Sequence, residues 1–315
     1  MTQLEHYPGI EVEQRGRVLV ARIDGGPRGE FGREIAADLA ALVTRAETDE
    51  GVGAVVLTGT HPERFVAHAD LAWLQEEGAA SPAVGPRAAS LVMHAASATR
   101  RIPGIRRLMD HTPLGGAMEL VALHEMLLRM NTCGAVFIAA INGSALGIGS
   151  EIALACDYRL MAAGDYVIGQ PEILVGIPPG GGGTQRLMRL VGPHHGLKIM
   201  LEGASLDPEA AAQIGYIDEV VAPDELLDRA VARADRLGRR LKYAVAAVKR
   251  AAYIGSSRGL EEGLHLESAE FLSTLANPGA QKAMLAYLEQ TAATGDLPLY
   301  DPQTYERIRD SGHFG

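Results

Sequence analysis

Short apolar runs alternate with helical patterns along the first two thirds of the chain. The β-branched and apolar runs predict strands, at Arg17–Asp24, Ala54–Gly59, Ala135–Ile141, Arg159–Ala162, Tyr166–Ile168 and Tyr216–Ala222. Between the first two strands, apolar residues at helical spacing predict a helix over Arg33–Thr48. Strands separated by helices favour a layered α/β domain.

The last third of the chain follows a helical pattern almost throughout. The segments with apolar residues at helical spacing are Asp207–Ile214, Asp224–Arg240, Tyr243–Ile254, Leu260–Leu275 and Gly279–Ala293. From Thr294 onward the sequence is polar, and we expect an irregular tail. We therefore expect residues 1–206 to form the core with the substrate site and residues 207–315 to form a helical C-terminal region.

The stretch from Gly78 to Cys133 does not fit strands. It opens with GAASPAVGPRAAS, a composition typical of a linker, and ends in a helix predicted at about Ala117–Met130. Two pairs of arginines lie within it, at Arg100, Arg101, Arg106 and Arg107. A phosphate site and a solvated surface both remain open for these arginines.

Composition narrows the class of protein. Of 315 residues, 47% are hydrophobic, which excludes general disorder, and 29 basic against 39 acidic residues give a net charge of −10. This excess of acid argues against nucleic acid as a partner. Only Cys133 and Cys156 occur, so the sequence predicts a reducing compartment. The longest apolar run, Ala135–Ile141, is far short of the roughly 20 residues of a membrane helix, and the start lacks a signal-peptide pattern. We expect a cytoplasmic protein that does not associate with membranes.

Several standard sites are missing or weak in the sequence. No Walker-type phosphate loop occurs, and the adjacent His194 and His195 are badly spaced for one metal, so we expect no metal site. Gly255–Gly259 (GSSRG) matches the G-x-S-x-G of a serine hydrolase, which requires a strand before it. The preceding VAAVKRAAYI is a helical pattern, so a turn between helices is favoured over a nucleophile.

The informative region runs from Ala139 to Arg186. We expect a strand to end at Asn142, glycines to turn the chain, and a helix to begin near Ile148. The free N–H groups and positive dipole end of such a helix suit a developing oxyanion.

Two carboxylates lie in apolar surroundings in this region. Glu151 occurs in the first turn of the predicted helix, within SEIALA, and Glu172 precedes the apolar ILVGIPP. Burying a carboxylate is costly unless it is paired or used. Each glutamate alone is compatible with a capping role, whereas the pair beside an anion-stabilising helix favours proton transfer next to an enolate.

A long pattern joins these residues to others upstream and downstream. Its segments are Phe65–Asp70 (FVAHAD), Ala140–Gly147 (AINGSALG), Glu151, Ala155–Asp157 (ACD), Gly169–Glu172 (GQPE) and Gly182–Arg186 (GGTQR). The pattern resembles the signature of the crotonase (enoyl-CoA hydratase/isomerase) superfamily, and most of all its hydratases. The resemblance spans about residues 10–290, apart from an apparent insertion at about 78–133.

The resemblance implies a fold and a chemistry. The fold is a crotonase-like spiral of repeated ββα units with a helical C-terminal oligomerisation region. The amides of Ala69 and Ile148 would hold the thioester oxygen as it becomes an enolate, while Glu151 and Glu172 would add water syn across the 2,3 double bond of a trans-2-enoyl-CoA. Isomerases of the family can use a single glutamate, so the pair favours hydration. An isomerase, another acyl-CoA reaction and a non-catalytic binding protein remain alternatives.

The resemblance also implies partners. The expected substrate and CoA contacts are Pro27, Arg28, Ala67, His68, Asp70 and Gly147. Asp70 and Asp157 are also expected to orient loops. No cofactor is expected, because coenzyme A is part of the substrate, and the family forms homotrimers that often pair into hexamers.

Four departures from the family pattern stand out. His68 and Ile148 each replace a common glycine, and the early loop GGPRGEFGREI lacks the usual Pro-x-x-x-Asn-Ala-Leu of the CoA site. The helical end LANPGAQKAMLAYLEQ lacks the usual terminal Lys-Arg. Contacts with CoA are therefore less well marked in this sequence than the glutamate pair.

Overall fold

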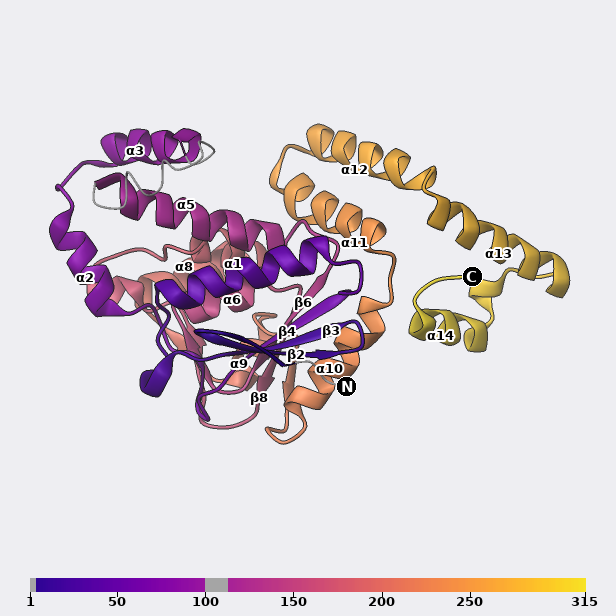
Figure 1. The fold of residues 1–315 in the computed structure, drawn as a ribbon, viewed down its shortest axis with the longest axis horizontal. Coiled ribbons are helices and arrows are strands. Elements are labelled where there is room, and N and C mark those ends of the chain that lie inside the picture. Colours follow the sequence, from indigo (N-terminus) through magenta and orange to yellow (C-terminus); the bar gives the residue numbers. More distant parts are fainter. Residues whose placement is uncertain (1–3, 100–112) are drawn as a thin grey trace.

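The structure is a computed structural model that describes residues 4–99 and 113–315. Its larger sheet has seven strands in the order β1-β2-β3-β4-β6-β8-β11 (Figure 1). Their bounds are Leu4–Tyr7, Ile10–Arg15, Val18–Ile23, Ala54–Gly59, Val136–Ile141, Tyr158–Ala162 and Glu219–Val221. Strands β3, β4, β6, β8 and β11 run parallel to one another, whereas β1 and β2 form an antiparallel edge that joins the sheet at β3. The four arginines at 100, 101, 106 and 107 lie outside the described residues, so the choice between phosphate site and surface stays open.

A second sheet of four short strands follows the order β10-β9-β7-β5. These strands are Ser205–Leu206, Ile168–Gly169, Ser144–Leu146 and Arg64–Val66. Each turn of the chain adds one strand to each sheet and then a helix: β4-β5-α2, β6-β7-α6, and β8-β9 followed by the η2 turn and α7. This confirms the predicted spiral of ββα units.

The two faces of the larger sheet are covered by different helices. On β4, Val55 and Leu57 face the side of α1 (Arg33–Thr48), while Ala54 and Val56 face the side of α10 (Leu226–Gly238). All four side chains are fully buried. A strand with both faces buried is expected to be a continuous apolar run, as AVVLTG is.

The other long helices surround this core. They are α2 (Leu71–Ala80), α3 (Pro86–Thr99), α5 (Pro113–Met130), α6 (Ile148–Ala155), α7 (Gly183–Val191), α8 (Pro193–Glu202), α9 (Pro208–Gln213) and α11 (Lys242–Lys249). Helix α3 packs on α5 through a small buried cluster of Ala96, Met118 and Val121. Helices α12 (Leu260–Leu275), α13 (Pro278–Thr294) and α14 (Pro302–Ser311) form an orange-to-yellow arm that extends from the core in Figure 1.

Several sequence predictions are confirmed and several are wrong. The bounds predicted for α1, β4 and α12 match the structure. The GAASPAVGPRAAS stretch is not one linker, since its first residues end α2 and Pro86 begins α3. The tail is not irregular throughout: the side chain of Asp301 caps the N-terminus of α14 by accepting from the Thr304 amide, a local hydrogen bond that stabilises a helix in a polar sequence.

The boundary predicted near residue 206 stays a prediction. Strand β11 pairs with β8, and α10 covers the larger sheet, so elements after residue 206 complete the core. The segment Gly255–Gly259 follows a turn of π-helix at Arg250–Ile254 and leads into α12. Because no strand precedes it, the serine-hydrolase alternative is wrong.

Candidate active site

The start of α6 is shaped by two glycines that no other residue can replace without strain. Gly147, the N-cap, has φ +53°, a backbone conformation that favours glycine. A Cβ on Gly149 would lie 2.0 Å from the Val66 carbonyl oxygen, so α6 can approach β5 only because this residue is glycine. The expected oxyanion helix therefore begins where the sequence predicts it.

Glu151 is buried and held by backbone amides. The Gly181 amide donates to both carboxylate oxygens at 2.8 Å, and the Gly183 amide donates to Oε1 at 2.7 Å. The residue is 2% exposed. The glycine run 180–183 follows Glu172 in the sequence, but its amides bind Glu151.

The electrostatic environment of Glu151 combines opposing effects. Burial raises the pKa of its carboxyl, because the charged form loses water. The amides of Gly183 and Gly181 oppose this rise in pKa, as do the charges of Arg186 and His124. These donors stabilise the carboxylate, so Glu151 is suited to accept a proton.

The glycine loop that holds Glu151 is itself held by side chains from two helices. On α7, Arg186 donates to the Gly181 carbonyl at 3.2 Å and to Asn131 Oδ1 at 3.1 Å. On α5, His124 Nε2 bonds the Gly180 carbonyl at 2.6 Å; since a carbonyl only accepts, Nε2 carries the proton. Sequence reasoning missed both contacts, because the partners lie up to 56 positions apart.

Glu172 has a contrasting environment. It is the first residue of the η2 turn (Glu172–Val175), and burial raises its pKa to about 7, with the charge of Glu151 adding to the rise. Its Oε2 is buried and has no hydrogen-bond partner among the described residues. A Cβ on Gly147 would lie 3.1 Å from Glu172 Oε1, so the carboxyl lies against the start of α6. Glu172 is thus suited to hold and deliver a proton near neutral pH.

The two amides predicted for the oxyanion hole have no competing acceptor. Neither Ala69 N–H nor Ile148 N–H donates to any residue that the structure describes. On both sides of Ala69 the backbone is fixed by Phe31, whose amide donates to the His68 carbonyl at 2.8 Å and whose carbonyl accepts from the Asp70 amide at 2.9 Å. Ile148 is the first residue of α6, so its N–H belongs to the unpaired group at a helix start.

The remaining residues of the FVAHAD segment serve the backbone around Ala69. His68 Nδ1 lies 2.8 Å from the Ala69 carbonyl, and the Ala67 amide donates to Gly29 at 2.7 Å. Asp70 caps α2 by accepting from the Ala72 and Trp73 amides. Asp157 accepts hydrogen bonds from the Phe137 amide and from Lys249. The expected roles of both aspartates in orienting loops stay predictions.

Pro27 and Arg28 lie in a short exposed turn, η1 (Gly26–Arg28). The Arg28 side chain is 71% exposed and pairs with Glu30 at 2.6 Å. Arg64 donates to the Arg28 carbonyl and so ties this turn to β5. The Arg28 guanidinium is therefore within reach of a ligand in solution, which is what a contact with CoA phosphates requires.

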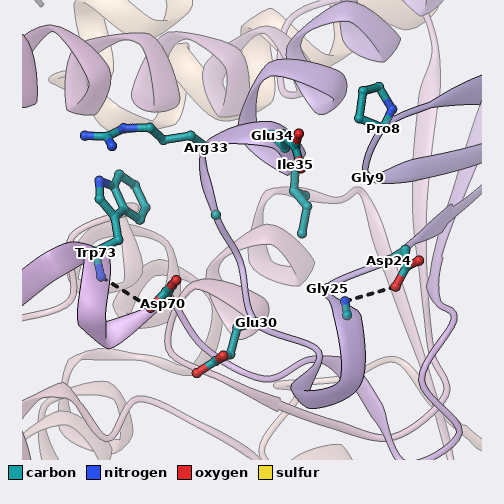
Figure 2. A pocket seen from close by; sticks show the side chains of 12 residues that line it. Pro8, Gly9, Asp24, Gly25, Glu30, Arg33, Glu34, Ile35, Asp70 and Trp73 are labelled. Carbon is teal, nitrogen blue, oxygen red and sulfur yellow. Dashed lines mark hydrogen bonds between the residues drawn. The ribbon is translucent and has the colours of Figure 1, made fainter.

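A pocket of about 410 Å³ lies beside this turn, with Gly26 in its lining (Figure 2). Its charged lining is mainly acidic, with Asp24, Glu30, Glu34 and Asp70 against Arg33, whose guanidinium stacks on Trp73. Glu151 and Glu172 do not line it. An acidic lining repels the anionic CoA, so this pocket is not the reaction site.

Two searches of the described residues bear on other classes of site. Between residues 4–99 and 113–315, no group of three or more His, Cys, Asp or Glu is placed to hold a metal. Over the same part of the chain, every helix is too short or too polar to cross a lipid bilayer.

The chain is similar to known proteins over most of its length. The family model described as enoyl-CoA hydratase/isomerase matches residues 116–294. A crotonyl-CoA hydratase from Syntrophomonas wolfei is 29% identical, with 91% of this chain and 97% of that protein covered. A short-chain-enoyl-CoA hydratase from Clostridium acetobutylicum is 28% identical with the same coverage. The crystal structure of an enoyl-CoA hydratase/isomerase from Cupriavidus metallidurans has the same fold, with a TM-score of 0.73 at 22% identity over 91% of this chain and 95% of that one.

Proposed function

Because the chain belongs to the enoyl-CoA hydratase/isomerase family, we propose that it hydrates a trans-2-enoyl-CoA with Glu151 and Glu172 as its acid–base pair. The observation that carries this proposal is the contrast between the two carboxyls. Amides hold Glu151, whereas Glu172 has one oxygen without a donor and a pKa of about 7. Carboxyls in environments that differ in this way divide into a base and an acid.

In the proposed reaction Glu151 acts as the base. Its carboxylate removes a proton from water as the water oxygen forms a bond to C3. The electron pair of the 2,3 double bond moves toward the thioester, and the carbonyl oxygen becomes the enolate oxygen. The N–H groups of Ala69 and Ile148 stabilise that charge, and one such donor contributes about 2.7–4 kcal/mol in other enzymes.

Glu172 acts as the acid in the second half of the step. Its carboxyl gives a proton to C2 as the enolate collapses, which yields the 3-hydroxyacyl-CoA. Glu151 belongs to the first turn of α6 and the Glu172 carboxyl lies against the start of that helix. We therefore propose that water and proton add to the same side of the double bond, as in syn addition. No redox change occurs, so we propose that the reaction needs no cofactor beyond the CoA of the substrate.

Isomerisation is the second candidate function. A double bond moves from C3 to C2 when one carboxyl removes a proton from C2 and returns it to C4, and Glu172 has the pKa for this role. This reaction leaves Glu151 without a part, yet two glycine amides orient Glu151. The pair therefore favours hydration, and it also argues against a binding protein without catalysis.

The exposed arm supports a proposal about assembly. Phe271 and Leu272 on α12 and Leu288 on α13 are each more than 60% exposed. Large apolar side chains gathered on two helices mark an interface between proteins. We propose a homotrimer, or a hexamer of paired trimers, and light scattering after gel filtration tests it. Phe271→Glu is expected to lower the particle mass, whereas Glu267→Gln on the same helix is not.

We propose a reducing compartment such as the cytoplasm. Cys133 and Cys156 are both free and buried, and burial raises the pKa of each thiol, so both stay protonated and unreactive.

The reaction product decides between the two functions. The protein is incubated in ¹⁸O-labelled water with trans-2-enoyl-CoA thioesters of several chain lengths, and separately with trans-3-enoyl-CoA. The products of each incubation are identified by mass spectrometry. Hydration gives a 3-hydroxyacyl-CoA that contains the label. Isomerisation of the 3-enoyl ester without uptake of label on any 2-enoyl ester would overturn the hydratase proposal.

A further inference from the structure

A buried hydrogen-bond network joins the elements that hold the two glutamates. Ser150 precedes Glu151 on α6, and Gln170 lies two positions before Glu172 at the end of β9. The third member, Tyr216, comes from the segment between α9 and β11. We call this the Tyr216–Ser150–Gln170 network.

The network has short contacts and is closed to solvent. Ser150 Oγ lies 2.5 Å from the Tyr216 hydroxyl oxygen, and Gln170 Nε2 donates to Ser150 Oγ at 2.9 Å. All three residues are 0% exposed. Buried hydrogen bonds of this kind fix geometry, because breaking one leaves a polar atom without a partner in a medium of low dielectric.

Tyr216 is anchored independently of the glutamates. Its amide donates to the Ala211 carbonyl at 2.8 Å, and its carbonyl accepts from Arg159 Nε at 3.1 Å. Arg159 also donates to the Cys156 carbonyl, directly after α6. The phenol therefore reaches Ser150 from a backbone that Arg159 ties to the C-terminal end of α6.

We propose that Tyr216 is a positioning residue that fixes the separation of the Glu151 and Glu172 carboxyls through Ser150 and Gln170. This inference rests on the proposed function, since the separation matters only if the two groups act on one substrate. Glu172 sits in a short turn whose other side chains are exposed, so its nearest rigid reference is Gln170. Displacement of a catalytic group by about 1 Å can cost about 100-fold in rate.

The phenol itself does not exchange protons in this scheme. Burial raises the pKa of Tyr216 to about 12, and the charges of Glu172 and Glu151 add to the rise. Tyr216 therefore stays neutral throughout the pH range of the reaction.

The test removes one hydroxyl at a time. Tyr216→Phe and Ser150→Ala each delete a single oxygen of the network, and Tyr253→Phe is the matched control. Tyr253 is a partly buried tyrosine whose hydroxyl donates to Asp157 at 3.2 Å, and no hydrogen bond among the described residues joins it to either glutamate. Three quantities are measured for each protein: the unfolding midpoint, kcat and KM for an enoyl-CoA, and the pKa of Glu172 by ¹³C NMR of labelled glutamate carboxyls.

The expected result separates positioning from stability. Tyr216→Phe and Ser150→Ala each lower kcat about 5- to 50-fold, while KM stays within about twofold of the parent value. The variant that carries both substitutions has a kcat no lower than that of the less active single variant, because both remove the same network. The pKa of Glu172 falls toward its ordinary value by at least about half a pH unit, because a loosened turn exposes the carboxyl to water and moves it away from Glu151. Tyr253→Phe lowers the unfolding midpoint alone.

Other outcomes have definite meanings. If Tyr216→Phe and Ser150→Ala lower the unfolding midpoint but leave kcat and the Glu172 pKa unchanged, the network is structural only and the inference is overturned. If Tyr216→Phe does not fold, Ser150→Ala alone decides between these results. If the parent hydrates no enoyl-CoA, the proposed function fails, while the NMR measurement still tests whether the network sets the environment of Glu172.

Discussion

Both carboxylate oxygens of Glu151 accept a hydrogen bond from the Gly181 amide, each at 2.8 Å. A Cβ on Gly181 would lie 2.6 Å from Glu151 Oε2, so this contact needs glycine at position 181. These amide bonds oppose the rise in the Glu151 pKa that burial causes, and no residue that the structure describes forms an ion pair with this carboxyl. The arrangement also explains why the glycine run follows the second glutamate in sequence but serves the first in space.

Arg186 hydrogen-bonds the glycine loop that holds Glu151. Its loss should therefore lower kcat more than it weakens substrate binding. In Arg186→Met the bonds to the Gly181 carbonyl and to Asn131 are lost, and the Glu151 pKa rises further because a nearby positive charge is gone. We expect kcat to fall about tenfold with KM nearly unchanged. Arg189→Met is the control, since Arg189 lies on the same helix but is exposed and, among the described residues, hydrogen-bonds only Gln185. Equal kinetics in both variants would contradict this role.

Gly147 should be intolerant of any side chain. In Gly147→Ala the residue has to keep φ +53°, and its Cβ would press on Glu172 Oε1 at 3.1 Å. We expect a loss of about 1–3 kcal/mol in unfolding free energy and at least a tenfold fall in kcat. Gly16→Ala has a similar φ of +59° in open space, so it should lose stability while keeping kcat. A Gly147→Ala enzyme as active as Gly16→Ala would rule out contact between this position and the working carboxyl.

The pH dependence follows from the Glu172 pKa of about 7. Hydration requires Glu172 to carry a proton while Glu151 is ionised. As the pH rises through about 7 that proton is lost, so kcat/KM should fall on the alkaline side. Dehydration starts from the form with the proton on Glu151 instead. The two forms hold the same total number of protons, so both directions should share this limb. Initial rates from about pH 5 to about pH 9, in both directions, check it. An alkaline limb in one direction only would contradict the assignment.

Arg28 should affect binding of the CoA moiety alone. Its exposed guanidinium pairs with Glu30, two positions away, and has no part in the proton transfers of the proposed scheme. In Arg28→Ala we expect KM to rise about 3- to 10-fold with kcat unchanged, and the effect to shrink in high salt. Arg15→Ala is the matched control, because Arg15 also forms an ion pair with a glutamate two positions away. The same KM in both variants would remove Arg28 from the CoA site.

Sequence patterns predicted the elements whose burial is regular. The strand AVVLTG and the helix over Arg33–Thr48 have the predicted bounds, because an apolar run or an amphipathic repeat reports burial directly. The two-residue strands β9 and β10 are too short to show a period, and β9 occurs two residues later than the start predicted at Tyr166. The helix α14 was missed because a capping aspartate, rather than an apolar repeat, marks its start.

The candidate site also has a part that the sequence predicts and a part that it does not. Glu151 and Glu172 stand out because carboxylates are unusual in apolar segments. The supports of these carboxyls could not be predicted, since each joins positions far apart in the chain. Ser150 and Tyr216 are 66 positions apart, and His124 reaches Gly180 over 56. A tyrosine or histidine in a helical or strand pattern does not indicate its hydrogen-bond partner, because the two residues come together only in the folded chain.

The central claim is that Glu151 and Glu172 are both needed to add water to an enoyl-CoA. Its most direct test compares the turnover of three proteins on one trans-2-enoyl-CoA: the parent, Glu151→Gln and Glu172→Gln. Turnover is measured as the loss of the conjugated absorbance, and circular dichroism checks that each variant is folded. Glutamine keeps the size of each side chain but cannot exchange a proton. The account predicts an active parent and a fall in kcat of at least about 100-fold in each variant. Near-parental turnover in either folded variant would contradict it.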